Sequence, residues 1–373
     1  MEKEYRILIT NGGSTSTKIA VRENHEVLLS VSVKHTTKEL EQYQTIWDQY
    51  DYRKQAVLKV LEEADIKLDS LDALVTRGGN MRAVEGGIYE IGEQMLEDMK
   101  SGLYGSHPCS VCNQIAYDMG KELGIPALVV DPPMTDELCS EARFSGSAAI
   151  QRISSFHALN QKATARKICG KMGKAYEDTD MIVVHLGGGI SVGAHKKGRV
   201  IDVNNALDGD GPFSPERSGD LPVGALIRLC YSGQYTCQEM LRQINGRGGL
   251  VSYLGTADCL EVEQRIKEGD ELAEAIYRAM AYQVAKAIGG AAAVLCGRVE
   301  AIAFTGSLAF SACFTGLIKE RIGFIAPVYL YPGENEMEAL GDGCLRYLTG
   351  REAKKAYPYT DREADDDKTD QRD

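Results

Sequence analysis

The sequence predicts an α/β protein with two related halves, each built on a mixed β-sheet flanked by helices. Three observations lead to this prediction. A hairpin with a glycine-rich turn occurs twice, at residues 6–22 and 181–195. Each hairpin is followed by segments of helical periodicity that alternate with short apolar strands, as expected of crossover units added to a hairpin. The length of 373 residues is also sufficient for two domains, each with its own core.

The first hairpin carries a loop suited to phosphate groups. An apolar strand-like run stops at Asn11-Gly12-Gly13, four hydroxyl residues and Lys18 follow, and apolar residues resume at position 19. Glycines expose backbone N–H groups, while hydroxyls and a lysine add donors and charge. The loop is not a Walker A motif, because Thr17 stands where that motif requires glycine before the lysine. Taken alone, it could equally be a plain polar turn.

The second hairpin repeats this design. An apolar strand leads to Gly187-Gly188-Gly189, and a new strand begins at Ile190. Both hairpins continue into a further extended segment, at residues 26–33 and 198–203. The repetition indicates an internal duplication. It favours a phosphate clamp made of two turns over two unrelated polar turns.

The remaining segments supply the helices and parallel strands. Helices are predicted over residues 52–63, 108–123, about 154–173, 270–296 and 337–348, and buried strands over 71–76, 125–130 and 299–304. Asp270 is the predicted N-cap of the long helix 270–296. The face of that helix directed to the core is predicted to carry Leu272, Ile276, Met280, Val284 and Ile288. Residues 204–222 form a long loop rich in Gly, Pro and Asp, and such loops are usually functional.

Composition excludes several classes of partner. The net charge of −12 argues against nucleic acid and anionic membranes. The longest uncharged apolar run, residues 287–297, is well short of the roughly 18 residues that cross a bilayer. The N-terminus lacks the apolar core of a signal peptide, and ten scattered cysteines fit a reducing compartment, so a cytoplasmic protein is predicted. Cys109 and Cys112 have CxxC spacing, and two positions on a helix are preferred over a zinc or redox role.

The motifs resemble those of the acetokinase family, and within it the butyrate kinases most closely. Residues 11–18, NGGSTSTK, are similar to its first phosphate motif, and residues 185–191, HLGGGIS, to its second. Residues 304–311, FTGSLAFS, resemble its adenosine motif. Residues 155–166, SFHALNQKATAR, and 210–221, DGPFSPERSGDL, resemble butyrate kinases rather than acetate kinases. Two positions depart from the family pattern: Gly12 replaces a proline, and Ser307 replaces a glycine.

The resemblance covers about residues 5–352 and implies a fold. It implies two duplicated actin-like, ribonuclease-H-like domains with the active site in the cleft between them. The first domain would comprise residues 1–155 and about 337–357, and the second residues 156–336, with a hinge near residue 155. Residues 358–373 are acidic and poor in apolar residues, so a disordered tail is predicted. Family members are oligomers, which implies a homo-oligomer here.

The resemblance also implies a reaction, the direct transfer of the ATP γ-phosphoryl group to a short-chain fatty acid. The products would be ADP and an acyl phosphate, with butanoyl phosphate favoured, and Mg²⁺ would be required. Arg77 and Arg217 would be the key cations, His157 would hydrogen-bond the phosphoryl oxygens, and Asp131 would orient an arginine or a Mg²⁺-bound water. Asp131 and Glu336 would be the Mg²⁺ ligands. Nucleotide contacts would come from Asn11, Gly13, Ser14, Ser16, Lys18, His185, Gly187, Gly188, Gly189, Thr305, Gly306 and Ser307.

Several alternatives remain open from the sequence. The acid could be acetate, propionate or a branched acid rather than butyrate. A kinase for a sugar or another alcohol is a second alternative, because it shares the scaffold. A chaperone-like ATPase or another non-catalytic ATP-binding protein is a third. A carboxylate kinase is favoured, because an alcohol would need a general base and would leave the two arginines without a purpose.

Overall fold

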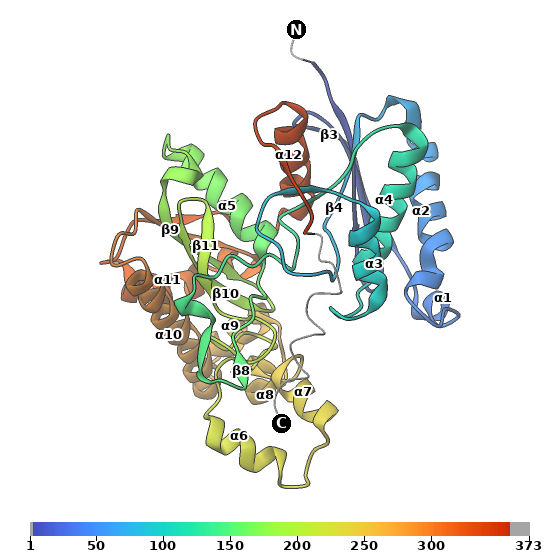
Figure 1. Ribbon diagram of the computed structural model, residues 1–373. Helices are drawn as coiled ribbons and strands as arrows, with labels where there is room; N and C mark the ends of the chain where they lie inside the picture. The colour runs from blue at the N-terminus through green and yellow to red at the C-terminus, as the bar shows by residue number, and fades with distance from the viewer. Residues whose placement is uncertain (1–2, 359–373) are drawn as a thin grey trace, which may run out of the picture. The chain divides into compact units, whose positions relative to one another are not determined.

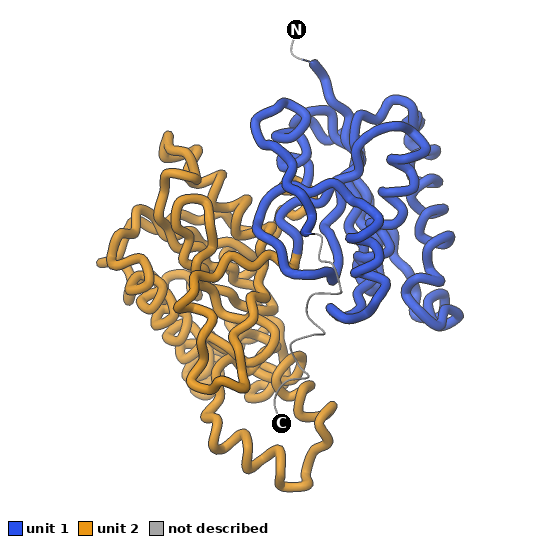
Figure 2. The backbone as a smooth tube through the Cα atoms, viewed as in Figure 1, with its two compact units in different colours: residues 1–132, 340–373 blue, residues 133–339 orange. Residues whose placement is uncertain are grey.

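The computed structural model describes residues 3–358, so almost all of the predicted tail, 358–373, lies outside the described residues. The chain divides into two compact units (Figure 2). Unit 1 runs to Pro132 and resumes at Leu340, and unit 2 is Pro133–Ala339. Among the described residues, no helix combines the length and apolar character needed to cross a membrane.

Unit 1 is built on a seven-stranded mixed sheet in the order β14-β5-β6-β4-β1-β2-β3 (Figure 1). The first three strands form the predicted antiparallel hairpin and its extension, and β1, β4 and β6 are parallel. Helices α2 and α4 cover one face, while α12 from Leu340 on packs against the other. The strands are β1 (Arg6–Gly12), β2 (Ser16–Glu23), β3 (Glu26–Lys34), β4 (Ala73–Thr76), β5 (Ile88–Glu90), β6 (Ala127–Val130) and β14 (Lys354–Lys355).

The helices of unit 1 agree with the sequence predictions where the apolar periodicity is long. They are α1 (Thr37–Leu40), α2 (Tyr50–Glu63), α3 (Glu93–Ser101), α4 (Cys109–Leu123) and the greater part of α12 (Glu336–Leu348), with short 3₁₀ helices η1 (Trp47–Gln49) and η2 (Leu68–Ser70). Ion pairing fastens α12 to the sheet, since Arg22 on β2 lies 3.1 Å from Asp342. Gly341 and Gly343 allow α12 to approach closely, because a Cβ at either position would collide with side chains of the sheet.

Unit 2 repeats the same strand arrangement. Its five-stranded sheet has the order β11-β10-β9-β12-β13, with an antiparallel hairpin and its extension on one side and parallel strands on the other. The order β3-β2-β1-β4-β6 in unit 1 is equivalent, so the predicted duplication and the two mixed sheets flanked by helices are confirmed. The strands are β9 (Asp180–Leu186), β10 (Ile190–Lys196), β11 (Arg199–Val203), β12 (Ala301–Thr305) and β13 (Val328–Leu330), with a separate hairpin of β7 (Phe144–Ser147) and β8 (Ile150–Gln151).

Two layers of helices enclose this second sheet. On one face, α10 and α11 pack over Ile182, Val184 and Val192, and on the other, α5 packs over Met181 and Val183. The strand side chains alternate between these two cores, as the period of two requires. The helices are α5 (Ala158–Lys171), α6 (Val223–Cys230), α7 (Cys237–Ile244), α8 (Gly249–Leu254), α9 (Cys259–Lys267), α10 (Glu271–Val294) and α11 (Ala312–Ile322), with 3₁₀ helices η3 (Glu141–Arg143), η4 (Tyr176–Asp178) and η5 (Ser307–Phe310).

The long helix α10 corrects one detail of the predicted core. Asp270 caps it as predicted, accepting a hydrogen bond from the backbone N of Ala273 at 2.9 Å. Met280, Val284 and Ile288 are buried as predicted, but Leu272 is 56% exposed, so its assignment to the core was wrong. The first turn instead directs Ala273 inward, because the buried face passes through residues 273, 277 and 281.

The segment 133–155 differs from its predicted placement in the first domain. It lies in unit 2 because its polar groups bond to unit 2 strands and helices. The carboxylate of Glu137 forms a fully buried ion pair with Lys162 on α5, at 2.8 Å, and accepts from the backbone N of Val200. Cys139 N also donates to Ile201 O on β11 at 2.9 Å.

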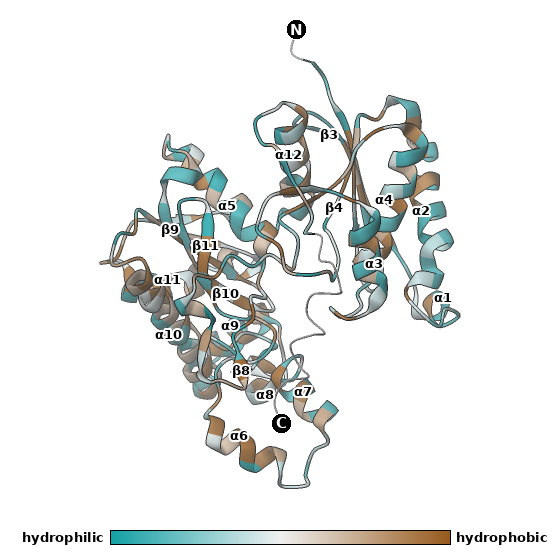
Figure 3. Cartoon of the chain, viewed as in Figure 1, coloured by the Kyte–Doolittle hydropathy of each residue, from teal (hydrophilic) through white to brown (hydrophobic). Residues whose placement is uncertain are grey.

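Helix α6 is unusual in that none of its residues is buried, although most are apolar (Figure 3). Val223 and Ile227 are more than half exposed. The sequence analysis predicted no helix between the loop 204–222 and Asp270. That loop is confirmed, since neither strand nor helix interrupts it between β11 and α6.

Candidate active site

The glycine turn of unit 2 is covered by the side chain of Arg217. A Cβ added to Gly189 would lie 1.8 Å from Arg217 Nη1, so the guanidinium occupies the space that only glycine leaves open. The turn itself is closed by a hydrogen bond from Gly187 N to Gly189 O of 3.1 Å. Ser214 holds the loop that carries Arg217 against the turn, since its Oγ donates to Gly188 O at 2.6 Å.

The guanidinium of Arg217 has few hydrogen-bond acceptors among the described residues. Nη1 donates to Ala206 O at 2.7 Å, whereas the buried Nε has no hydrogen-bond partner within residues 3–358. Burial lowers the pKa of Arg217, although an arginine remains charged near neutrality. In the described part of the chain, no carboxylate forms an ion pair with it. A partly desolvated cation with unused donors is well suited to an anionic ligand.

Substitution of the neighbouring Gly189 tests this packing. We expect Gly189→Ala to lower turnover by about tenfold or more, because the methyl group must displace the guanidinium and small misplacements are costly. Gly170→Ala on α5 is the control, since an added Cβ there would meet no atom within 4 Å. Steady-state kinetics and thermal melts of both variants provide the measurement. Equal activities would show that the position of Arg217 over Gly189 does not matter.

Two histidines stack beside this turn. His157 lies at the N-cap of α5 and His185 near the end of β9, and their ring centroids are 3.7 Å apart with an interplanar angle of 10°. Nδ1 of His157 lies 2.9 Å from Ser191 Oγ. Nδ1 of His185 lies 2.8 Å from Asn160 Oδ1. Both histidines were predicted site residues, but their stacking was not predicted from the sequence.

The predicted adenosine motif lies at the end of the next parallel strand. Thr305 ends β12 and pairs in register with His185 on β9. Gly306 has a φ of 86°, and a Cβ there would lie 2.3 Å from Leu186 O, so both its conformation and its contacts require glycine. Ser307 opens η5 without a positive φ, so serine at this position causes no backbone strain. The unit 2 candidates therefore gather at the carboxyl ends of β9 and β12.

The unit 1 candidates gather at a corresponding edge. The turn between β1 and β2 is closed by a hydrogen bond of 2.8 Å from Gly13 N to Ser16 O. Arg77 follows β4 directly and Asp131 follows β6. Because β1, β4 and β6 are parallel, their carboxyl ends meet at one edge of the sheet. Lys18 lies on β2 opposite Asn11, with an exposed side chain.

A buried arginine that the sequence analysis missed supports the unit 1 turn. The guanidinium of Arg53 is fully buried and donates to Gly13 O (3.1 Å), Ser14 O (3.5 Å), Ser16 O (3.3 Å) and Thr17 Oγ1 (2.9 Å). The signal was present in the sequence, because Arg53 shares its helix face with the buried Val57 and Leu61 at intervals of four. A charged residue in such an apolar stripe indicates a buried polar role.

The two cysteines of the CxxC spacing lie on α4 beneath the same turn, as predicted. Both are free and buried. Burial raises the pKa of Cys109 to about 12 and that of Cys112 to about 11, so both remain thiols near neutrality. Gly12 leaves room for this arrangement, because a Cβ there would lie 2.8 Å from Cys112 Sγ.

The two predicted magnesium ligands, Asp131 and Glu336, lie in different segments of the chain. Asp131 is buried with a φ of 41°, and its Oδ1 accepts from Gly87 N at 2.8 Å. Glu336 is the first residue of α12. Within residues 3–358, no three His, Cys, Asp or Glu side chains cluster as metal ligands. Mg²⁺ that is bound mainly through phosphate oxygens and water needs only one or two carboxylates, so the single carboxylate of Asp131 at the edge of the unit 1 sheet is enough for such an ion.

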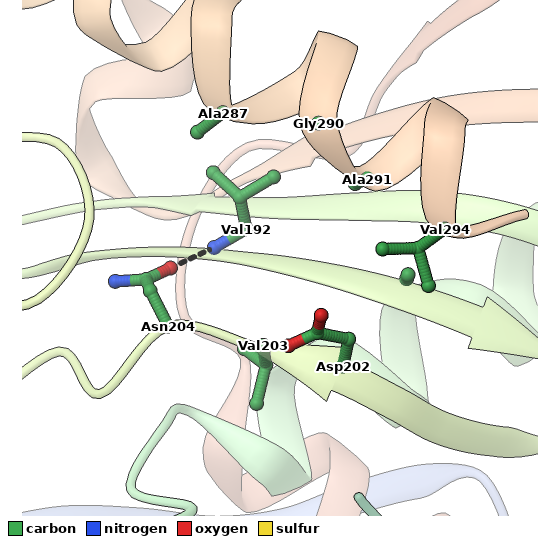
Figure 4. Close-up of a pocket in the computed structure, with 9 residues that line it drawn as sticks. Val192, Asp202, Val203, Asn204, Ala287, Gly290, Ala291 and Val294 are labelled. Atoms are coloured by element: carbon green, nitrogen blue, oxygen red, sulfur yellow. Dashed lines mark hydrogen bonds between the residues drawn. The ribbon is translucent and has the colours of Figure 1, made fainter. Parts of the chain in front are cut away.

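A pocket of about 240 Å³ lies between α10 and strands β10 and β11 (Figure 4). Its walls include Val192, Ala287 and Val294, and Asn204 closes one side by accepting from Val192 N at 2.8 Å. The single charged lining residue is Asp202, which pairs with Arg152 at 3.0 Å. A pocket that presents a carboxylate and no cation is unsuited to a fatty acid anion or a triphosphate.

Residues 144–318 match the sequence profile of the Acetokinase family. The chain is therefore similar to this family over less than half of its length. Within the matched segment lie the stacked histidines, the second glycine turn, Arg217 and the Thr305-Gly306-Ser307 motif. The unit 1 candidates and Glu336 lie outside it.

Solved structures of acetokinases are similar over nearly the whole chain. The acetate kinase of Porphyromonas gingivalis matches with a TM-score of 0.77 and 19% identity over 91% of this chain and 99% of its own. The propionate kinase of Francisella tularensis matches with a TM-score of 0.72 and 17% identity over 91% and 98%. The acetate kinase of Entamoeba histolytica matches with a TM-score of 0.71 and 16% identity, over 91% of this chain and 98% of its own. These similarities confirm the predicted actin-like fold of the two sheets.

Proposed function

We propose that this protein is a short-chain carboxylate kinase that uses ATP and Mg²⁺, with butyrate as its preferred acid. It would be a phosphotransferase with a carboxyl group as acceptor, giving an acyl phosphate and ADP. The observation that carries the proposal is the guanidinium of Arg217, which is partly desolvated and packed over the glycine turn of an acetokinase segment. Butyrate is preferred because residues 155–166 and 210–221 resemble those of butyrate kinases.

The chemistry requires positioning and charge neutralisation rather than a strong base. A carboxylic acid with a pKa near 4 is already a nucleophilic anion at neutral pH. Arg217 and Arg77 would orient the carboxylate and stabilise the charge on the moving phosphoryl group, and a planar guanidinium suits both anions. In other phosphoryl-transfer enzymes, an arginine with this role raises the rate by about 10³–10⁵.

The backbone turns and histidines would complete the environment of the phosphates. N–H groups of the two glycine-rich turns would bind phosphate oxygens, and His157 and His185 would donate or accept hydrogen bonds beside them. The Thr305-Gly306-Ser307 motif would contact the adenosine. Asp131 and Glu336 would hold Mg²⁺ or its water ligands, and the ion would supply charge neutralisation of the phosphates when bound.

A substrate panel tests the proposal and separates the alternatives. Purified protein is incubated with ATP, Mg²⁺ and hydroxylamine, which traps acyl phosphates, and with acetate, propionate, butyrate, isobutyrate or glycerol. We expect hydroxamate from the short acids, with the highest kcat/KM for butyrate, and no ADP release that depends on glycerol. ADP release with glycerol alone would indicate an alcohol kinase. Slow ATP hydrolysis unaffected by any acid would indicate a non-catalytic ATP-binding protein.

A further inference from the structure

A chain of buried hydrogen bonds leads from His157 into the interior of unit 2. His157 Nδ1 lies 2.9 Å from Ser191 Oγ, which lies 2.7 Å from Gln161 Nε2. Gln161 Oε1 lies 2.9 Å from His195 Nε2, and His195 Nδ1 lies 2.8 Å from the hydroxyl of Tyr176. Ser191, Gln161 and His195 have no exposed surface, and Tyr176 is 3% exposed. A buried donor or acceptor without a partner costs free energy, so each hydrogen in this network is expected to point at one acceptor.

The direction of these hydrogen bonds follows from the backbone carbonyl of Ser191. Gln161 Nε2 lies 3.1 Å from Ser191 O, which can only accept, so the amide nitrogen faces Ser191 and the amide oxygen faces His195. His195 therefore donates from Nε2 and accepts at Nδ1 from Tyr176. This requires a neutral ring, in agreement with burial and the nearby cations Lys162 and Arg166, which lower the pKa of His195 well below its usual value.

The same reasoning fixes the proton of Ser191. Its Oγ accepts from Gln161 Nε2, and among the described residues His157 Nδ1 is the acceptor within reach of its own hydrogen. A fully buried hydroxyl would otherwise leave its donor unpaired. His157 Nδ1 consequently accepts, and in the neutral ring the proton lies on Nε2.

We propose that Gln161, His195 and Tyr176 are positioning residues that hold His157 as an Nε2–H donor. The inference deepens the proposed function and depends on it for its catalytic consequence, which is that Nε2–H donates to an oxygen of the transferred phosphoryl group. The interior of unit 2 thus sets the protonation of a ring that is itself only half-buried. Tyr176 is in turn held by Lys162 and Arg166, which lie 5.7 Å and 5.3 Å from its ring centroid.

His185, which stacks on His157, carries its proton on Nδ1. Asn160 Nδ2 donates to Glu334 O at 2.7 Å, so its Oδ1 faces His185 and accepts from Nδ1–H. Nε2 of His185 is directed at the glycine turn, where a Cβ on Gly187 would approach it to 2.8 Å. The two rings therefore have opposite tautomers, and His185 is an internal reference for the experiment.

Nitrogen NMR of the ¹⁵N-histidine-labelled protein tests the assignment directly. The chain has six histidines, and the signals of His157 are identified by their loss in His157→Gln. We expect a protonated Nε2 and an unprotonated Nδ1 for His157 in the unaltered protein, and the reverse for His185. A protonated Nδ1 on neutral His157 in the unaltered protein would overturn the proposal.

Gln161→Glu then tests whether the buried hydrogen bonds impose this tautomer on His157. The carboxylate replaces the donor to Ser191 by an acceptor, so the Ser191 hydroxyl turns inward and His157 must donate from Nδ1. We expect a protonated Nδ1, a fall in kcat of about tenfold or more, and a KM for the acid changed by less than about threefold. Thr315→Val on α11, which removes a buried hydroxyl outside this hydrogen-bond network, is the control for stability and should leave the NMR pattern unchanged.

The two proposals fail separately in these experiments. Absence of acyl phosphate with every acid, together with the expected tautomers, would reject the proposed function and keep the assignment of protons. Acyl phosphate formation with a protonated Nδ1 on His157, or with unchanged tautomers in Gln161→Glu, would reject the role of Gln161, His195 and Tyr176.

Discussion

Arg217→Ala is expected to lower turnover with ATP and butyrate by about a hundredfold or more while the fold is retained. The substitution removes a cation whose role in phosphoryl transfer is worth about 10³–10⁵ in related chemistry. The fold should survive, because within residues 3–358 the side chain contributes one hydrogen bond, to Ala206 O. It also rests on a glycine turn that is closed by its own backbone hydrogen bond. Steady-state hydroxamate formation and circular dichroism provide the measurement.

An exposed arginine of the same unit supplies the control. Arg278 on α10 is about half exposed and lies 3.8 Å from Glu274, one helical turn away. Such surface pairs contribute about 0–1 kcal/mol, so Arg278→Ala should leave both turnover and stability close to those of the unaltered protein. Near-normal acyl phosphate formation by a folded Arg217→Ala variant would contradict the role assigned to Arg217.

Arg53→Met is expected to have the largest effect in unit 1. The substitution keeps an unbranched apolar stem but removes five hydrogen bonds from the guanidinium, three of them to carbonyls of the glycine-rich turn. Loss of partners for buried acceptors should lower the free energy of unfolding by on the order of 3 kcal/mol. The loosened turn should raise the KM for ATP by about tenfold or more.

The same helix provides a matched control for this substitution. Lys59 on α2 is about three-quarters exposed and pairs with Glu63 at 3.7 Å, so Lys59→Met removes a charge without touching the turn. Urea denaturation and ATP titration of both variants would separate the two effects. An unchanged KM for ATP in Arg53→Met would show that the turn does not bind the nucleotide, whatever the loss of stability.

Local chemistry made much of the fold predictable. Glycine and hydroxyl residues between apolar runs identified both hairpins, because turn geometry depends on a few neighbouring residues. Long amphipathic periodicity identified α2, α4 and α10 with bounds within two or three residues. The helices α6 to α9 were not predicted, because each has only six to nine residues, which is too short to establish an apolar period.

The candidate site was predictable only in part. Arg217 and His185 could be selected because the segments that carry them, residues 210–221 and 185–191, resemble motifs of a known family. Arg53 and Gln161 could not, because their roles arise from contacts with residues far along the chain, at Gly13 and His195 respectively. Leu272 was misassigned for a related reason, since the core face of α10 is set by the helices packed beside it.

Phosphorus NMR of the purified protein with Mg²⁺, ATP and butyrate tests the central claim most directly, because it observes the transferred group itself. The account predicts an acyl phosphate resonance that grows as the ATP γ-phosphate declines, and the formation of ATP when ADP and butanoyl phosphate are supplied instead. Appearance of inorganic phosphate alone in the forward direction, and no ATP in the reverse, would contradict it.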